Sequence, residues 1–210
     1  MKLRDELKNY EHIIFDWNGT LLHDVELVCN ILGESLTRHE LPALSMNEFK
    51  DRFSFPIDSF YLSVGFTEDH LDSTHQYYKH NYFTRYKEEK LFEGTTELLK
   101  ELNANDKKIS VLSAAKEDHL HEALAHFDLI PHVHHIYGVD NHFAKGKVER
   151  GHELLSQITI PREKTIIVGD TLYDAEVGKS LNIDVLLIAD GHQSYEQLIS
   201  SNCKVLRSRY

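Results

Sequence analysis

Short apolar runs alternate with amphipathic segments through most of the chain. The apolar runs predict buried strands at 12–15, 109–112, 136–137, 165–168 and 185–188. Helical spacing of the apolar residues predicts helices at about 94–103, 116–126, 147–157, 173–181 and 194–200. Strands that alternate with helices predict an α/β fold, a Rossmann-like parallel sheet with helices on both faces. A ligand site in such a sheet lies at the carboxyl ends of the strands.

Residues 24–90 interrupt this alternation. Three stripes of apolar and aromatic residues keep helical spacing there: Val25, Val28, Leu32 and Leu36; Ile57, Phe60, Tyr61 and Val64; and Leu71, His75, Tyr78, Tyr82 and Tyr86. Stripes of this kind indicate helices that pack on one another. We therefore expect a small all-helical cap domain at 23–90, inserted into an α/β core domain that comprises residues 1–22 and 91–210.

The composition and net charge of the chain limit the classes of molecule that it could bind. Hydrophobic residues make up 41% of the 210 residues and charged residues 27%, which is typical of a globular protein. The net charge of -11 argues against nucleic acid or an anionic membrane surface as a partner. No apolar run approaches the roughly 20 residues of a membrane span. With no secretory signal and only two cysteines, we expect a cytoplasmic protein, either a monomer or a homodimer.

Two acidic motifs follow predicted strands. Asp16 ends the first strand and is followed by Asn18-Gly19-Thr20, a tight turn in which glycine lets the backbone approach a ligand. A carboxylate in this position can attack phosphorus and form an aspartyl-phosphate. Asp170 ends a later strand, with Asp174 four residues on, and paired carboxylates suit a hard cation such as Mg²⁺.

Two further motifs could hold a phosphoryl group. Ser113 follows the strand at 109–112, and its hydroxyl and the free amides of the next helix could bind phosphate. Lys145 and Lys147 lie at the start of a predicted helix, where one ammonium could neutralise both the nucleophile and the phosphoryl group. Taken alone, Ser113 also fits a helix N-cap, and the lysines fit a solvated charge run. The topology brings all four motifs to one edge, so together they predict phosphoryl chemistry.

This order of motifs resembles the haloacid dehalogenase-like superfamily. The helical insertion after the first motif resembles its phosphoglycolate-phosphatase branch, and the resemblance extends over essentially the whole chain. It implies a Mg²⁺-dependent phosphatase that acts on a small phosphorylated metabolite through an aspartyl-phosphate on Asp16.

The resemblance also implies roles for individual residues. Those that would bind Mg²⁺ are Asp16, Asn18 through its main-chain carbonyl, and Asp170, with Asp174 as an outer partner. Those that would bind the phosphoryl group are Thr20, Ser113, Ala114 and the motif lysine. The spacing to the acidic pair in relatives with Lys-Pro fits Lys145, whereas the missing proline and the following helix favour Lys147.

Asn18 departs from the family pattern. Most phosphatases of the family have a second aspartate there, which protonates the leaving oxygen and then activates water. An amide cannot transfer a proton at neutral pH, and the loss of general acid–base catalysis lowers the rate by about 10²–10⁴. We therefore expect a phosphatase that is slow or restricted to good leaving groups.

Two alternatives remain. The protein could be a binding or regulatory protein that holds a phosphorylated ligand, or a phosphonate-type hydrolase. The second needs a cap lysine, and Lys50, Lys79 and Lys87 lie in no recognisable motif. Within the expected cap, Arg52 is a candidate for a substrate anion, and His23 and Asp24 are candidates for a replacement acid.

Overall fold

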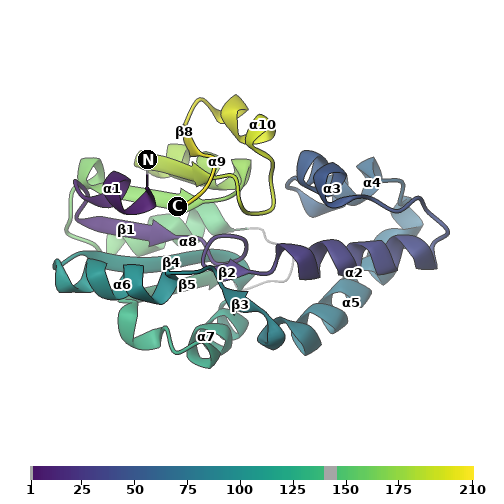
Figure 1. The fold of residues 1–210 in the computed structure, drawn as a ribbon, viewed down its shortest axis with the longest axis horizontal. Helices are drawn as coiled ribbons and strands as arrows, with labels where there is room; N and C mark the ends of the chain where they lie inside the picture. Colours follow the sequence, from purple (N-terminus) through teal and green to yellow (C-terminus); the bar gives the residue numbers. More distant parts are fainter. Residues whose placement is uncertain (1, 140–145) are drawn as a thin grey trace.

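The computed structural model describes residues 2–139 and 146–210, which fold around a six-stranded parallel sheet (Figure 1). The strand order is β5-β4-β1-β6-β7-β8. The bounds are β1 (His12–Phe15), β4 (Lys108–Lys116), β5 (His135–Val139), β6 (Thr165–Gly169), β7 (Asp184–Ile188) and β8 (Lys204–Leu206). Phe15, at the end of β1, pairs with Val111 and Val168 on the two neighbouring strands. The loops that follow β1, β4 and β6 therefore open on one edge.

Helices cover both faces, as expected for an α/β fold. Ile13 and Phe15 belong to one apolar cluster and Ile14 to another, because successive side chains of a strand point to opposite faces. The first cluster includes residues of α1 (Leu3–Leu7), α6 (Thr95–Ala104) and α7 (Glu117–His126). The second includes residues of α8 (Lys147–Ser156) and α9 (Leu172–Leu181), and α10 (Tyr195–Leu198) packs beside β7.

Four further helices lie beside the edge at which β1 ends (Figure 1). They are α2 (Val25–Arg38), α3 (Met46–Arg52), α4 (Ile57–Ser63) and α5 (Glu68–Arg85), and residues 25–85 are called the helical segment below. The chain enters it through β2 (Leu22–His23) and leaves it towards β3 (Lys90–Leu91). These two strands pair antiparallel, and the expected domain boundaries fall within this ribbon. Within residues 2–139 and 146–210, no helix combines the length and apolar character needed to cross a bilayer.

The structure differs from the predicted elements at the end of β4 and in several short elements. β4 continues through Ser113 to Lys116, with an irregular register against β5, so Ser113 lies in the strand and not in a turn before the helix. The strands β2, β3 and β8 were not predicted, because two or three residues show no detectable period. Helix α3 was also missed, although Ser45 and Glu48 form the capping box that a Ser-x-x-Glu sequence can signal.

His12, the first residue of β1, is a buried titratable group in this core. Its Nε2 lies 2.8 Å from Ser110 Oγ on β4, and its Nδ1 has no hydrogen-bond partner among the described residues. Burial, together with the nearby charges of His135 and Lys108, lowers the pKa of His12 to about 4. The folded protein therefore holds His12 neutral at neutral pH.

We expect the free energy of unfolding to fall as the pH drops from about 6.5 to about 4, because His12 binds a proton in the unfolded chain and not in the folded one. The full effect amounts to about 3 kcal/mol. His12→Gln should flatten this part of the pH profile, measured by urea denaturation. The exposed helical residue His121 provides the control, His121→Gln. A His12→Gln profile identical to that of the wild type would contradict the assignment.

Candidate active site

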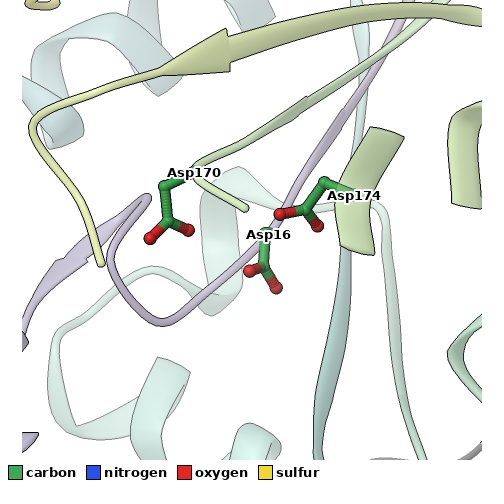
Figure 2. A group of neighbouring side chains, drawn as sticks. All are labelled: Asp16, Asp170 and Asp174. Atoms are coloured by element: carbon green, nitrogen blue, oxygen red, sulfur yellow. The ribbon is translucent and has the colours of Figure 1, made fainter. Parts of the chain in front are cut away.

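Three carboxylates meet at the carboxyl edge of the sheet (Figure 2). Asp16 follows β1, Asp170 follows β6, and Asp174 lies in the first turn of α9, with one oxygen of each within 4.8 Å of the others. Asp170 and Asp174 are fully buried, and Asp16 is only 8% exposed. Negative charge withdrawn from water in this way requires a compensating charge.

Lys147 supplies a positive charge to this cluster. It is the first residue of α8 and 1% exposed, and its Nζ lies 2.8 Å from Asp16 Oδ1 and 2.7 Å from Asp174 Oδ1. Burial alone would lower the pKa of Lys147, but the two carboxylates outweigh it and hold the pKa above its ordinary value. Of the two lysines suggested by the sequence, Lys147 thus contacts the expected nucleophile. Lys145 lies outside the described residues.

Opposing effects act on the pKa of the Asp16 carboxyl group. Burial raises its pKa, the ammonium of Lys147 counteracts this, and the carboxylates of Asp174 and Asp170 raise it further. The net result is a pKa above the ordinary value for aspartate. A second positive charge beside Asp16 would therefore favour its ionised, nucleophilic form.

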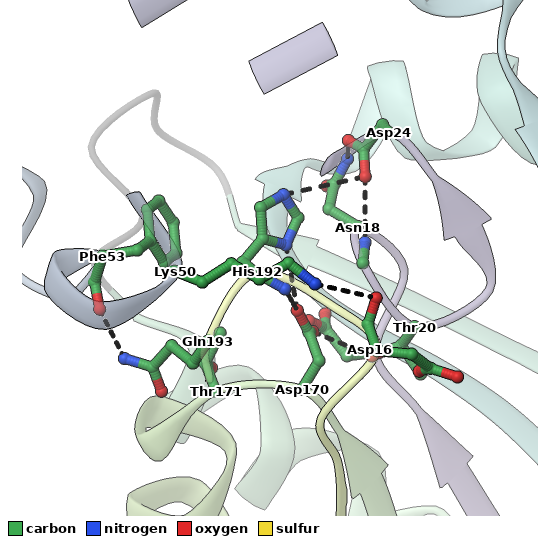
Figure 3. Close-up of polar contacts among 12 residues, drawn as sticks. Asp16, Asn18, Thr20, Asp24, Lys50, Phe53, Asp170, Thr171, His192 and Gln193 are labelled. Carbon is green, nitrogen blue, oxygen red and sulfur yellow. Dashed lines mark hydrogen bonds and ion pairs between the residues drawn. The ribbon is translucent and has the colours of Figure 1, made fainter. Parts of the chain in front are cut away.

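Asp170 is held by donors from two loops (Figure 3). Thr20, which was expected at the phosphate, donates through Oγ1 to Asp170 Oδ1 at 2.9 Å. His192, in the loop after β7, donates its main-chain N–H to Oδ2 at 2.7 Å, and its Nδ1 lies 2.9 Å from the same oxygen. Burial alone would raise the pKa of Asp170, but the hydrogen bonds and charge of His192 outweigh it, so the pKa is lowered.

Two glycines let these loops approach Asp170. Gly19 has φ +69°, and a Cβ there would lie 2.2 Å from Asp170 Oδ2 and from His192 Nδ1. A Cβ at Gly191 would lie 2.3 Å from the Cβ of Asp170. Any side chain at either position would displace the loop. His192 was not among the expected site residues, although the rule that ligands bind at carboxyl strand ends pointed to its loop.

Asn18 faces the helical segment through its amide nitrogen (Figure 3). Nδ2 lies 2.6 Å from Asp24 Oδ2 and 2.5 Å from the hydroxyl of Tyr82. Tyr82 in turn donates to Asp24 Oδ2 at 2.7 Å, and the Gly19 N–H donates to Asp24 Oδ1 at 2.9 Å. Asp24, suggested by the sequence as an alternative acid, is fully buried and hydrogen-bonded to Asn18.

The other expected residues lie as follows. Ser113 is 1% exposed, and its Oγ accepts a hydrogen bond from the Ala115 N–H at 3.1 Å; Ala114 lies between them in β4. Arg52 is exposed at the end of α3. His23 is exposed and packs its ring against Phe92 at 4.4 Å. Arg52 and His23 lie outside the hydrogen-bonded network described above.

A family model for haloacid dehalogenase-like hydrolases matches residues 13–188, most of the chain. The chain belongs to this family. No curated protein matches it significantly.

Three solved structures are similar to this chain, at sequence identities that establish the fold alone. A haloacid dehalogenase-like family hydrolase from Streptococcus pneumoniae has a TM-score of 0.81 and 20% identity, over 94% of this chain and 93% of that chain. A predicted phosphatase from Clostridium acetobutylicum has a TM-score of 0.78 and 22% identity, over 95% of this chain and 94% of that chain. A predicted phosphoglycolate phosphatase from Haemophilus somnus has a TM-score of 0.74 and 15% identity, over 96% of both chains.

The donor set of this haloacid dehalogenase-like hydrolase fits a hard divalent cation. The clustered side chains offer carboxylate oxygens, which Mg²⁺ prefers, and no sulfur or imidazole ligand belongs to the cluster among the described residues. Asp16 and Asp170 could hold the ion together with the main-chain carbonyl of Asn18. Asp174 already accepts hydrogen bonds from Lys147 and from the Thr171 hydroxyl, at 2.7 and 2.6 Å, which suits an outer role.

Lys147→Met should destabilise the protein, because Asp16 and Asp174 would lose the ammonium that they share. Removing one partner of a buried ion pair lowers stability by about 3–5 kcal/mol. Urea denaturation in EDTA measures the change, with Lys100→Met, at an exposed position on α6, as the control. A loss within the range of ordinary surface substitutions, about 0.5 kcal/mol, would show that the carboxylates do not depend on Lys147.

Proposed function

We propose that this protein is a Mg²⁺-dependent phosphatase that hydrolyses a small phosphorylated metabolite through an aspartyl-phosphate on Asp16. The observation that carries the proposal is the contact of Lys147 Nζ with Asp16 Oδ1, beside Asp170, at the carboxyl ends of the central strands. It combines a nucleophile, a phosphoryl-binding cation and acidic metal ligands in one buried site. Membership of a hydrolase family supports the same reaction class.

In this proposal Asp16 attacks phosphorus. A bond from Asp16 to phosphorus forms as the bond from phosphorus to the leaving oxygen breaks, and the alcohol or phenol departs as its oxyanion. Water then attacks phosphorus, the bond between Asp16 and phosphorus breaks, and inorganic phosphate leaves while the proton of water passes to phosphate or solvent, which restores the carboxylate. Lys147 has three N–H donors, and two of them are directed to Asp16 and Asp174, so the third can reach a phosphoryl oxygen. The Ser113 hydroxyl accepts from Ala115 and can donate its own hydrogen to a second phosphoryl oxygen.

Asp16, Asp170 and the main-chain carbonyl of Asn18 would hold Mg²⁺ in this site. When bound, the ion would supply positive charge that lowers the repulsion between the anionic nucleophile and the anionic substrate. The pKa of Asp16, raised by burial and by two carboxylates, supports the need for such a charge. The hydrogen bonds on Asp170 would meanwhile keep that ligand ionised.

Asn18 restricts the substrates that can be turned over. Its amide nitrogen is hydrogen-bonded to Asp24 and to the Tyr82 hydroxyl, and an amide gives up no proton to a leaving oxygen at neutral pH. The leaving group then departs without a proton from this residue, which favours aryl, acyl and enol phosphates over alkyl esters. The same contacts favour an alternative, in which the protein binds a phosphorylated ligand with little turnover.

A phosphonate-type hydrolase is a further candidate, favoured by Lys50 of α3. Its Nζ lies 3.5 Å from the main-chain oxygen of Asp190, within reach of the loop that contacts Asp170 (Figure 3). Burial lowers the pKa of Lys50, against the charges of Asp190 and Asp170, and a lowered pKa suits imine formation. Borohydride should trap Lys50 with a carbonyl-bearing phosphonate if this alternative holds, and no adduct would exclude it.

Hydrolysis of p-nitrophenyl phosphate should require Mg²⁺ and disappear in Asp16→Asn, because an amide cannot attack phosphorus. The absorbance of released p-nitrophenol, with Mg²⁺ and with EDTA, measures both effects. Lys147→Ala should reduce turnover far more than Lys145→Ala, a control from the same motif. Full activity in EDTA would refute the metal requirement, and an active Asp16→Asn would refute the nucleophile.

Exchanging the Asn18 amide with the Asp24 carboxylate should allow the enzyme to hydrolyse esters with poorer leaving groups. Asn18→Asp alone would set two carboxylates against each other at a contact that is now 2.6 Å, whereas Asn18→Asp/Asp24→Asn retains the hydrogen bond. The exchange places an acid beside the reaction, so we expect turnover of alkyl phosphates to rise about 10-fold or more. The dependence of rate on leaving-group pKa should also flatten.

Rates for a series of aryl and alkyl phosphates measure this change, with Asp24→Asn as the control that lacks a carboxylate at residue 18. An exchange variant with turnover near zero on every ester would support the binding protein instead. A wild type that hydrolyses alkyl phosphates at about 10 s⁻¹ would show that Asn18 imposes no restriction.

A further inference from the structure

Arg209 joins three segments that are distant in the sequence. It follows β8 and is 8% exposed, and its Nη1 donates to the main-chain oxygen of Thr20 at 2.6 Å. Nε and Nη2 donate to the two carboxylate oxygens of Asp190, at 2.9 and 2.7 Å. The guanidinium also lies over the ring of Phe92, 3.4 Å from its centroid. One side chain therefore contacts the loop after β1, the loop after β7 and the residue after β3.

Two of these loops end on the same carboxylate. Thr20 donates to Asp170 Oδ1, and His192, two residues after Asp190, donates to Oδ2. Arg209 thus binds the main chain of the loop after β1 and the Asp190 side chain of the loop after β7, and these two loops supply the donors to Asp170. Arginine suits this position because its planar fork can bind a carboxylate with two N–H groups while another reaches a carbonyl.

The contact of Arg209 with Phe92 lies where the chain returns from the helical segment. The Phe92 N–H donates to the Leu21 oxygen at 3.0 Å, so the outgoing and returning connections are tied together beneath Arg209. The next residue, Tyr210, donates its hydroxyl to the Glu93 oxygen at 2.8 Å. Residues 209–210 therefore contact both connections between the sheet and the helical segment.

We infer that Arg209 is a positioning residue for the metal site, which sets the affinity for Mg²⁺ by holding the two loops that orient Asp170. The inference rests on the proposed function, in which Asp170 is a Mg²⁺ ligand. Without the guanidinium, the buried Thr20 carbonyl and Asp190 lose their charged donor, and the donors to Asp170 lose their fixed spacing. Loss of such outer hydrogen bonds typically weakens metal binding about 10–100-fold.

Calorimetric titration of the metal-free protein with MgCl₂ tests this role without substrate. Arg209→Gln should raise the Kd for Mg²⁺ about 10-fold or more. The control is Arg207→Gln, because Arg207 is exposed and stacks on Tyr195 at 3.6 Å, with no hydrogen bond or ion pair to Thr20 or Asp190 among the described residues. Its Kd should equal that of the wild type.

Amide chemical shifts of the metal-free proteins supply a second readout. Arg209→Gln should move the resonances of Thr20 and His192, whereas Arg207→Gln should leave both in place. If Arg209→Gln does not fold, Arg209→Lys and Asp190→Asn, which keep a polar side chain, are titrated and should also bind Mg²⁺ more weakly.

A folded variant with unchanged affinity for Mg²⁺ would overturn the role of Arg209 and leave the proposed function intact. A wild type that binds no Mg²⁺ would overturn both, so the two failures are distinguishable.

Discussion

At the carboxyl edge of the sheet, three carboxylates are withdrawn from water around one ammonium group. Ionised groups are stable in such a place only when they are paired and hydrogen-bonded, and Lys147 provides both for Asp16 and Asp174. The first turns of α8 and α9 supply Lys147 and Asp174, respectively, to this cluster. The remaining negative charge beside Asp170 would suit a divalent cation.

The fold and the charged centre of the site could be predicted because their signals are local. Asp16 and Asp170 each follow a buried apolar run, so strand periodicity and the strand-end rule identified them, whereas Lys147 was favoured over Lys145 only through the family resemblance. The residues that orient them could not be found in this way. His192 contacts Asp170 from 22 positions away and Arg209 contacts Thr20 from 189 positions away, and no periodicity or spacing in the chain singles out either residue.

The contacts of Asn18 connect the reaction site to the helical segment. Asp24 directly precedes α2 and Tyr82 belongs to α5, so one amide bonds to two of the four helices. A carboxyl group at this position would change its hydrogen bonds with each proton that it gained or lost. The amide keeps the same two N–H donors at every pH.

The two-residue ribbon of β2 and β3 has a consequence for how this protein can change. Leu22 pairs with Leu91, so the polypeptide leaves the sheet and returns to it at neighbouring points. A replacement of any length between these points needs to span only the distance between paired strands, about 5 Å. The helices could therefore be exchanged as a module, by recombination or by design, while Asp16, Lys147 and Asp170 keep their places.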